Sequence, residues 1–302
     1  MITEKFTEQV IKGIEHKTIL PKGTALVLEG GGTRSFYSAG VFEAFMDCGL
    51  MFPYIAAVSG GAANAMSYIS GQPRRNRVIV DKYVHKKDYV GYRNLFKYGS
   101  LFGYDFIFKT VPGEHVFWDR EVFDNTKIRF VTGATDCLTG ESVWFEKEDI
   151  GPDFKATVAS CSVPLLSKIV HINDRKLLDG GISAPIPIEK SIEDGNDFHV
   201  VVLTRNEGFR QQQVKHRRLI QRFYKNYPKI ADAVLKRHEV YNRQLALCEK
   251  LEKESKALII RPLIPLTVGR TTSDREKLLA LYDEGHDEGR DVVKRLANIL
   301  QI

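Results

Sequence analysis

The stretch Tyr54-Ile-Ala-Ala-Val-Ser-Gly-Gly61 carries the strongest local signal in this sequence. Its apolar run is typical of a buried strand, and the glycines after Ser59 indicate a tight turn. The small-residue run 62–70 then predicts a closely packed helix. A serine on such a strand-to-helix turn is typical of the nucleophile elbow G-x-S-x-G, with Gly61 as its second glycine and Ala57 in place of the first.

The same pattern occurs upstream, where the apolar run Thr24 to Glu29 ends in Gly30, Gly31 and Gly32. A helix is predicted over 35–48. Strand, glycine turn and helix, repeated twice, predict a parallel α/β sheet. Three consecutive glycines can point several N–H groups at one anion, as acyl transfer through a tetrahedral intermediate requires. A nucleotide phosphate loop is disfavoured because neither G-x-x-x-x-G-K-[ST] nor G-x-G-x-x-G is present.

The rest of the chain predicts one α/β catalytic domain over 1–205 and a mainly helical C-terminal extension over 206–302 packed on it. The extension is strongly charged. Further predicted strands are 127–134, 142–145, 198–203 and 257–261; further predicted helices are 154–161, 187–194, 219–225, 228–255 and 273–300.

A third motif is Leu177-Leu178-Asp179-Gly180-Gly181. Taken alone, an Asp-Gly pair more often forms an ordinary turn than it supplies a base. In order and composition, however, the glycine loop, the serine elbow and this aspartate resemble the patatin-like phospholipase family. The resemblance covers residues 24–205.

The matching motifs are G-G-G-x-R at Gly30 to Arg34, the elbow at Ala57 to Gly61, and D-G-[GA] at Asp179 to Gly181. A softer match is A-S-x-A-x-P at 159–164, with serine at 162 in place of alanine, and Ser35 replaces a frequent glycine. The resemblance implies a three-layer α/β/α fold with a mainly parallel central sheet. It further implies acyl ester hydrolysis without metal or cofactor, by a dyad of Ser59 and Asp179. Gly30, Gly31 and Gly32 would be the oxyanion donors, supported by Arg34, Gly61 and Gly181.

Aspartate is a weak base because its ordinary pKa lies near 3.9. Burial beside Leu177 and Leu178 would raise the pKa of Asp179 and so improve the base. The alternative is a classical triad with His171 or His199, but both histidines fit structural or surface positions better. Arg34 would either steer a phosphate headgroup or anchor the glycine loop through a carboxylate.

The segment Lys82 to Lys109 interleaves nine tyrosines and phenylalanines with lysines and an arginine. This composition suits a lipid–water interface, a lid or an acyl-pocket wall; equally, the rings would form core beneath an insertion. The basic run Lys215 to Arg218, with Arg222 and Lys225, suits an anionic surface, although a solvated helix face is the commoner explanation. No nucleic-acid motif accompanies either segment, so no nucleic-acid partner is expected.

Composition and charge limit the kinds of partner, metal site and cellular location that this chain can have. The net charge of +6 and pI near 9.0 mildly favour anionic partners, and four cysteines without a CxxC pair argue against a metal cluster or a disulfide framework. The first eight residues lack the apolar core of a secretory signal, and no run approaches about 18 apolar residues. We therefore expect a cytoplasmic protein, with peripheral contact at the inner face of the membrane.

Three functions follow from these motifs. The first is a lipid acyl hydrolase of the phospholipase, lysophospholipase or carboxylesterase type. The second is a transacylase that uses the same dyad, and the third is a non-catalytic lipid-binding protein on the same fold. The intact Ser59, Asp179 and triple glycine argue against the third.

Overall fold

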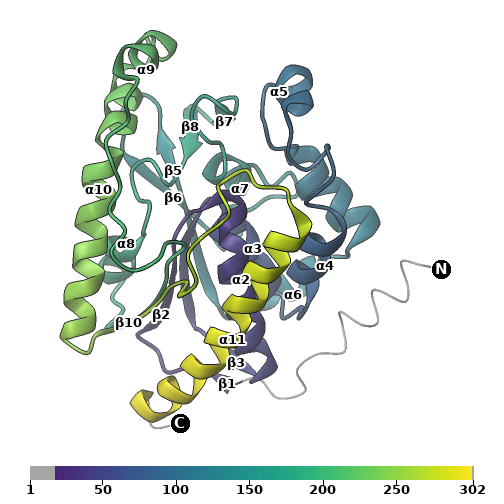
Figure 1. The fold of residues 1–302 in the computed structure, drawn as a ribbon, viewed down its shortest axis with the longest axis vertical. Coiled ribbons are helices and arrows are strands. Elements are labelled where there is room, and N and C mark those ends of the chain that lie inside the picture. The colour runs from purple at the N-terminus through teal and green to yellow at the C-terminus, as the bar shows by residue number, and fades with distance from the viewer. Residues whose placement is uncertain (1–17, 301–302) are drawn as a thin grey trace.

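The computed structural model describes residues 18–300 (Figure 1). The N-terminal residues 1–17, on which the expectation of no secretory signal rests, lie outside the described residues. An eight-stranded sheet of order β10-β9-β2-β4-β5-β8-β7, with β6 paired to β5, forms the centre. Its strands are β2 (Thr24–Leu28), β4 (Tyr54–Val58), β5 (Arg129–Asp136), β6 (Ser142–Glu146), β7 (Val170–Ile172), β8 (Arg175–Asp179), β9 (Phe198–Val202) and β10 (Ala257–Ile260); β1 (Thr18–Ile19) and β3 (Leu50–Met51) pair separately.

The sheet is mainly parallel. Strands β10, β9, β2, β4 and β5 run in one direction, whereas β6 and β8 are antiparallel to β5, and β7 is antiparallel to β8. Every residue of β2 and β4 is buried. Parallel strands covered on both faces read as continuous apolar runs, which is why the sequence signalled these two strands so clearly.

Helices cover both faces of the sheet (Figure 1). Leu26 and Leu28 belong to a core shared with α2 (Phe36–Asp47), α3 (Gly60–Ile69) and α11 (Arg275–Leu300). Ala25 and Val27 point the other way, into a core shared with α8 (Ile188–Glu193) and α10 (Pro228–Lys253). The predicted three-layer α/β/α fold with C-terminal helices is therefore confirmed.

Residues after 205 take part in both outer layers and in the sheet. Strand β10 pairs with β9, and α11 lies along α2, where Tyr282 donates a 2.7 Å hydrogen bond to Glu43. Helix α9 (Arg217–Phe223) leads into α10 at the end of the molecule that is uppermost in Figure 1. The division of the chain near residue 205 stays a prediction. No helix among residues 18–300 is long and apolar enough to cross a membrane.

The aromatic segment between α3 and β5 forms several short helices. Some of its rings are buried, as expected of a core, and others are exposed, as expected of a lipid–water interface. Phe102 and Phe108 are buried in the core, whereas Tyr92 and Phe96 are exposed. The short elements of this segment are α4 (Arg75–Lys82), α5 (Tyr92–Tyr98), the π-helix η2 (Phe106–His115) and α6 (Arg120–Asn125). Elsewhere, η1 (Gly32–Ser35) begins within the glycine loop, and η3 (Lys147–Asp149) and α7 (Lys155–Ser160) follow β6.

Candidate active site

Ser59 occupies the turn between β4 and α3. Its backbone has φ +56° and ψ −135°, a strained conformation for a residue with a side chain. A side-chain hydrogen bond fixes the backbone of this turn: Ser59 N donates a 2.8 Å hydrogen bond to Ser160 Oγ, which also accepts a hydrogen bond from Thr132. The softer motif at 159–164 thus positions the elbow through Ser160. The elbow raises the Ser59 hydroxyl above the sheet, as this turn does in hydrolases.

The Ser59 Oγ atom donates a 2.8 Å hydrogen bond to Asp179 Oδ2. The two residues are 120 positions apart in sequence, and strand register brings them together. Val58 pairs with Gly133 of β5, and Asp179 pairs with the next residue, Ala134, from the other side. Ser59 and Asp179 therefore stand at the same level on either side of β5.

The Asp179 carboxylate is fixed and buried. Its Oδ1 atom accepts a 2.6 Å hydrogen bond from Gly181 N, and its backbone bonds Ser162 and Thr135. Burial raises the pKa of Asp179, while the hydrogen bonds from Ser59 and Gly181 and the charges of Arg270 and Arg237 oppose that rise. A raised pKa makes this carboxylate a stronger base than a free aspartate. Since the folded chain retains this proton to higher pH than the unfolded chain, the ionised carboxylate costs stability.

The glycine loop lies against the elbow. A Cβ on Gly30 would lie only 3.0 Å from Ser59 Cβ, so the loop approaches the serine as closely as glycine permits. Gly30 N donates to the Pro185 carbonyl at 3.2 Å, and Thr33 N to the Arg270 carbonyl at 2.9 Å. The N–H groups of Gly31 and Gly32 are therefore the candidate oxyanion donors of this loop.

Arg34 is buried beneath the loop, and its Nε donates a 3.3 Å hydrogen bond to the Thr204 carbonyl. Burial lowers the pKa of Arg34 to about 9. Repulsion by Arg205 lowers this pKa further, whereas attraction by the Glu29 carboxylate raises it. Glu29 itself accepts a 2.6 Å hydrogen bond from Thr204 N. Arg34 is thus held by a backbone carbonyl, and among the described residues it makes no hydrogen bond or ion pair with a carboxylate; Glu29 interacts with it electrostatically. Its role as an anchor of the glycine loop stays a prediction.

The two candidate histidines lie elsewhere. His199 is buried against Ser191, and burial lowers its pKa to about 4. His171 is exposed on β7. Within residues 18–300, no histidine lines either cavity at Ser59, so the geometry offers no triad there.

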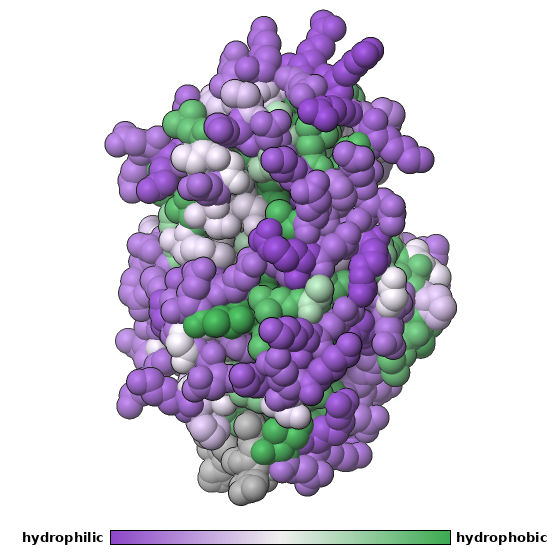
Figure 2. Space-filling model, turned by 90° about the vertical axis from the view of Figure 1, so that its left-hand side faces the viewer, coloured by the Kyte–Doolittle hydropathy of each residue, from purple (hydrophilic) through white to green (hydrophobic). Residues whose placement is uncertain are grey.

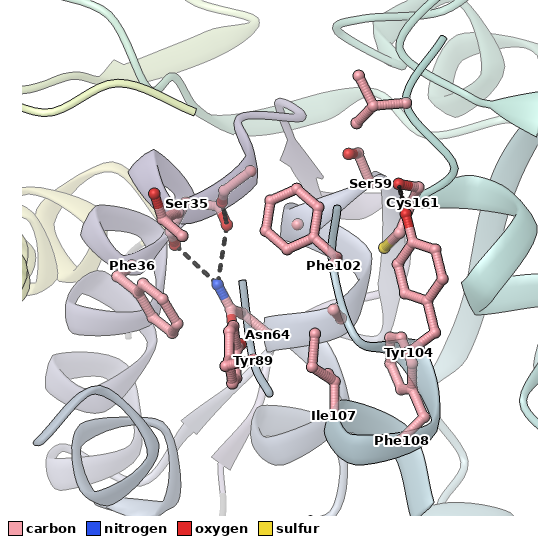
Figure 3. A pocket seen from close by; sticks show the side chains of 15 residues that line it. Ser35, Phe36, Ser59, Asn64, Tyr89, Phe102, Tyr104, Ile107, Phe108 and Cys161 are labelled. Atoms are coloured by element: carbon pink, nitrogen blue, oxygen red, sulfur yellow. Dashed lines mark hydrogen bonds between the residues drawn. The ribbon is translucent and has the colours of Figure 1, made fainter. Parts of the chain in front are cut away.

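Two cavities meet at Ser59. The first, the apolar cavity, holds about 50 Å³; Figure 3 shows Phe102, Tyr104, Ile107 and Phe108 on its wall, with the Tyr104 hydroxyl bonded to the Cys161 carbonyl. The second, the basic cavity, holds about 210 Å³, and its polar and glycine lining includes Gly31, Ser59, Asp179, Gln211, Arg237 and Arg270. The rest of its wall is largely aliphatic, with Val163, Pro164, Leu165, Ile182, Val214, Ile220 and Val234.

Sequence reasoning missed Arg237 and Arg270. Arg237 lies on α10, where its Nε donates a 2.6 Å hydrogen bond to the Gly181 carbonyl. Arg270 lies in the loop before α11. Nothing in their local sequence distinguishes them from the many solvated arginines of the extension. The described residues also contain no cluster of three or more His, Cys, Asp and Glu side chains arranged to hold a metal ion.

Comparison of the sequence with known proteins identifies relatives of this chain. Residues 227–301 match a domain of unknown function, DUF6363. The uncharacterized protein YjjU of Escherichia coli K12 is 25% identical over 198 residues, which cover 61% of this chain and 52% of YjjU. The uncharacterized NTE family protein Rv1063c of Mycobacterium tuberculosis H37Rv is 27% identical over 168 residues, covering 54% of this chain and 44% of Rv1063c. The chain thus spans about half the length of these curated relatives.

Among solved structures, VipD from Legionella pneumophila aligns with a TM-score of 0.42 and 11% identity, covering 91% of this chain and 67% of VipD. The family model described as patatin-like phospholipase matches residues 26–191, which is more than half of the chain and includes the glycine loop, Ser59 and Asp179. The protein therefore belongs to the patatin-like phospholipase family.

Proposed function

We propose that the protein is a serine-dependent lipid acyl hydrolase that cleaves fatty acyl esters through an acyl-enzyme. The observation that carries the proposal is the 2.8 Å hydrogen bond from Ser59 Oγ to the buried carboxylate of Asp179. Membership of the patatin-like phospholipase family supports a lipid ester as substrate.

In the proposed reaction, Asp179 accepts the Ser59 proton while Oγ attacks the ester carbonyl. The N–H groups of Gly31 and Gly32 bind the oxyanion, and each such donor lowers the barrier by about 3 kcal/mol. Protonated Asp179 then gives its proton to the leaving alcohol. Water, activated in turn by Asp179, attacks the acyl-enzyme and releases the fatty acid.

The acyl chain would occupy the apolar cavity. Its wall includes aromatic and aliphatic side chains from the segment between α3 and β5, among them Phe102, Ile107 and Phe108. An apolar wall stabilises a methylene chain by about 0.8 kcal/mol for each CH₂ group that it removes from water. The small volume favours short chains unless the wall moves.

Access to a lipid surface would come from α5 and α9, both at the upper end of the molecule in Figure 1. On α5, Tyr92 and Phe96 are 74% and 88% exposed, next to Arg93 and Lys97. On α9, Leu219 and Phe223 are exposed among basic side chains. Figure 2 shows isolated hydrophobic side chains among hydrophilic ones at the top of the face that carries α10 and α9. Exposed rings beside cations suit contact with anionic lipid.

The test is labelling by a fluorophosphonate, together with hydrolysis of p-nitrophenyl butyrate, in wild type, Ser59→Ala and Asp179→Asn. We expect both variants to lose at least about 99% of turnover, because each removes one half of the dyad. Ser38→Ala is the matched control, since the buried Ser38 hydroxyl has no hydrogen-bond partner among the described residues.

Labelling that survives in Ser59→Ala would reject Ser59 as the nucleophile, and full activity of Asp179→Asn would reject the dyad. A wild type that is neither labelled nor active, with short esters or with phospholipid vesicles, would reject the hydrolase. Adding glycerol as an acceptor separates hydrolysis from acyl transfer: a glyceride product in place of free acid would identify a transacylase.

A further inference from the structure

The basic cavity differs from the apolar one in carrying charged side chains between aliphatic ones such as Leu165 and Ile182, and its cations come from outside the family match. Asp179 and Ser59 line it together with Arg237 of α10 and Arg270 of the loop before α11. Both arginines lie within residues 227–301, the part of the chain that matches a domain of unknown function. The C-terminal extension therefore supplies one wall of the space beside the candidate nucleophile.

The loop that carries Arg270 is pressed against the glycine loop. The Arg270 carbonyl accepts the 2.9 Å hydrogen bond from Thr33 N, and Thr33 Oγ1 donates a 3.2 Å hydrogen bond to the Gly269 carbonyl. Gly32 packs so closely that a Cβ there would lie 2.2 Å from Arg270 O. These backbone contacts fix the position of Arg270 relative to the candidate oxyanion donors.

The Arg270 side chain, by contrast, has no hydrogen-bond or ion-pair partner among residues 18–300. It is partly exposed in the basic cavity. Arg237, in the same cavity, donates from Nε to the Gly181 carbonyl at 2.6 Å and from a second nitrogen to Gln211 at 3.3 Å, and it makes no hydrogen bond to a carboxylate in the part of the chain that the structure describes.

The surrounding charge is positive. Arg34, Arg205, Arg237 and Arg270 interact electrostatically, and the carboxylates among them are Glu29 and Asp179. Four cations against two anions leave an excess of two positive charges. Burial, with repulsion by Arg270, lowers the pKa of Arg237 to about 10. Crowded guanidinium groups of this kind bind phosphate and carboxylate strongly, because each offers a fork of donors.

The reaction assigns the two cavities to the two halves of an ester. Asp179 must return its proton to the oxygen of the leaving alcohol, so the alcohol has to depart on the side of Asp179. Asp179 lines the basic cavity and not the apolar one. The alcohol half therefore enters the space that contains Arg237 and Arg270.

We propose that Arg270, backed by Arg237, forms an anion-binding subsite that selects acyl esters whose alcohol half carries an anionic group. This inference rests on the proposed hydrolase. The cavity of about 210 Å³ has space for a glycerol phosphate at the arginines, and its aliphatic side chains, among them Ile182, Ile220 and Val234, would contact an apolar part of the alcohol half.

The experiment compares kcat/KM for substrates with one acyl chain and different alcohols: neutral monoacylglycerol, acylglycerol phosphate, and an acyl ester of a hydroxy acid. We expect wild type to prefer the anionic substrates and Arg270→Gln to lower the ratio of kcat/KM for anionic substrates to that for monoacylglycerol by about tenfold or more. Arg270→Lys should restore part of the preference, because it keeps the charge but loses the fork. Arg290→Gln, an exposed arginine of α11, is the control.

The comparison between phosphate and carboxylate esters identifies which anion the subsite takes. A wild type without preference for anionic substrates, or an Arg270→Gln variant that loses all three activities equally, overturns the subsite while leaving the hydrolase intact. Should all three substrates prove inert, binding of glycerol 3-phosphate by calorimetry decides independently. Binding that Arg270→Gln weakens about tenfold supports the subsite, and absence of binding overturns it.

Discussion

The contact between the glycine loop and the C-terminal extension can be tested at one atom. Gly32 has φ +59°, and a Cβ added there would lie 2.2 Å from Arg270 O, whereas real Cβ contacts essentially never fall below 3.0 Å. In Gly32→Ala the 270 loop must therefore retreat by about 0.8 Å or more. That movement breaks the 2.9 Å hydrogen bond from Thr33 N to Arg270 O.

The expected cost has two parts. Left-handed backbone costs alanine about 1–2 kcal/mol, and the lost hydrogen bond costs about 1 kcal/mol more. Gly32→Ala should thus lower the free energy of unfolding by about 2–3 kcal/mol in urea titrations. Because Gly32 is also a candidate oxyanion donor, hydrolysis of p-nitrophenyl butyrate should fall at least about tenfold.

Gly208→Ala is the matched control. Gly208 has φ +76°, and a Cβ there would meet nothing within 4 Å, so this variant carries the backbone strain without the clash. It should lose about 1–2 kcal/mol of stability and keep full activity. If Gly32→Ala costs no more than Gly208→Ala and remains active, the extension does not hold the glycine loop in place.

Three further outcomes are expected. Since the pKa of Asp179 is raised in the fold, Asp179→Asn should exceed wild type in unfolding free energy at pH 8 by about 1.4 kcal/mol per unit of pKa elevation. The excess should begin to fall once the pH drops below that raised pKa and should vanish below the pKa of the unfolded aspartate, about 3.9. An excess independent of pH in urea titrations would contradict the raised pKa. Ile107 lines both the apolar cavity and the one adjoining it, so Ile107→Ala should raise the rate ratio of p-nitrophenyl octanoate to butyrate severalfold; an unchanged ratio would place the chain elsewhere. Replacing Tyr92 and Phe96 by serine should weaken sedimentation with vesicles of anionic phospholipid about tenfold, whereas Ile192→Ser, 40% exposed on α8, should not; equal losses would refute α5 as a docking site.

Much of the fold followed from short-range patterns. The buried runs of β2 and β4 and the glycine turns after them are signals that a few neighbouring residues carry, and both strands lie where they were predicted. The long helices α10 and α11 were likewise predicted within a few residues. The β7–β8 hairpin was not predicted. It is a short edge element whose exposed first residues lack the continuous apolar run of the central strands.

Composition alone did not decide whether the aromatic segment before β5 forms core or a lipid interface. Phenylalanine and tyrosine in a row of short helices satisfy a core and a lipid interface equally well. Only the packing directs Phe108 against Phe154 and turns Phe96 into solvent. The sequence held both interpretations open because the distinction depends on contacts made far along the chain.

By itself, the sequence determined the chemical groups of the site: the glycine loop, a serine on an elbow and an aspartate before glycines. Tertiary structure alone decided that Ser59 and Asp179 meet, because their 2.8 Å contact depends on the register of two strands on either side of β5. It also decided that Arg237 and Arg270 face that pair. Charged residues of the extension resemble a solvated face until packing sets them beside a reacting group, and no local pattern encodes that placement.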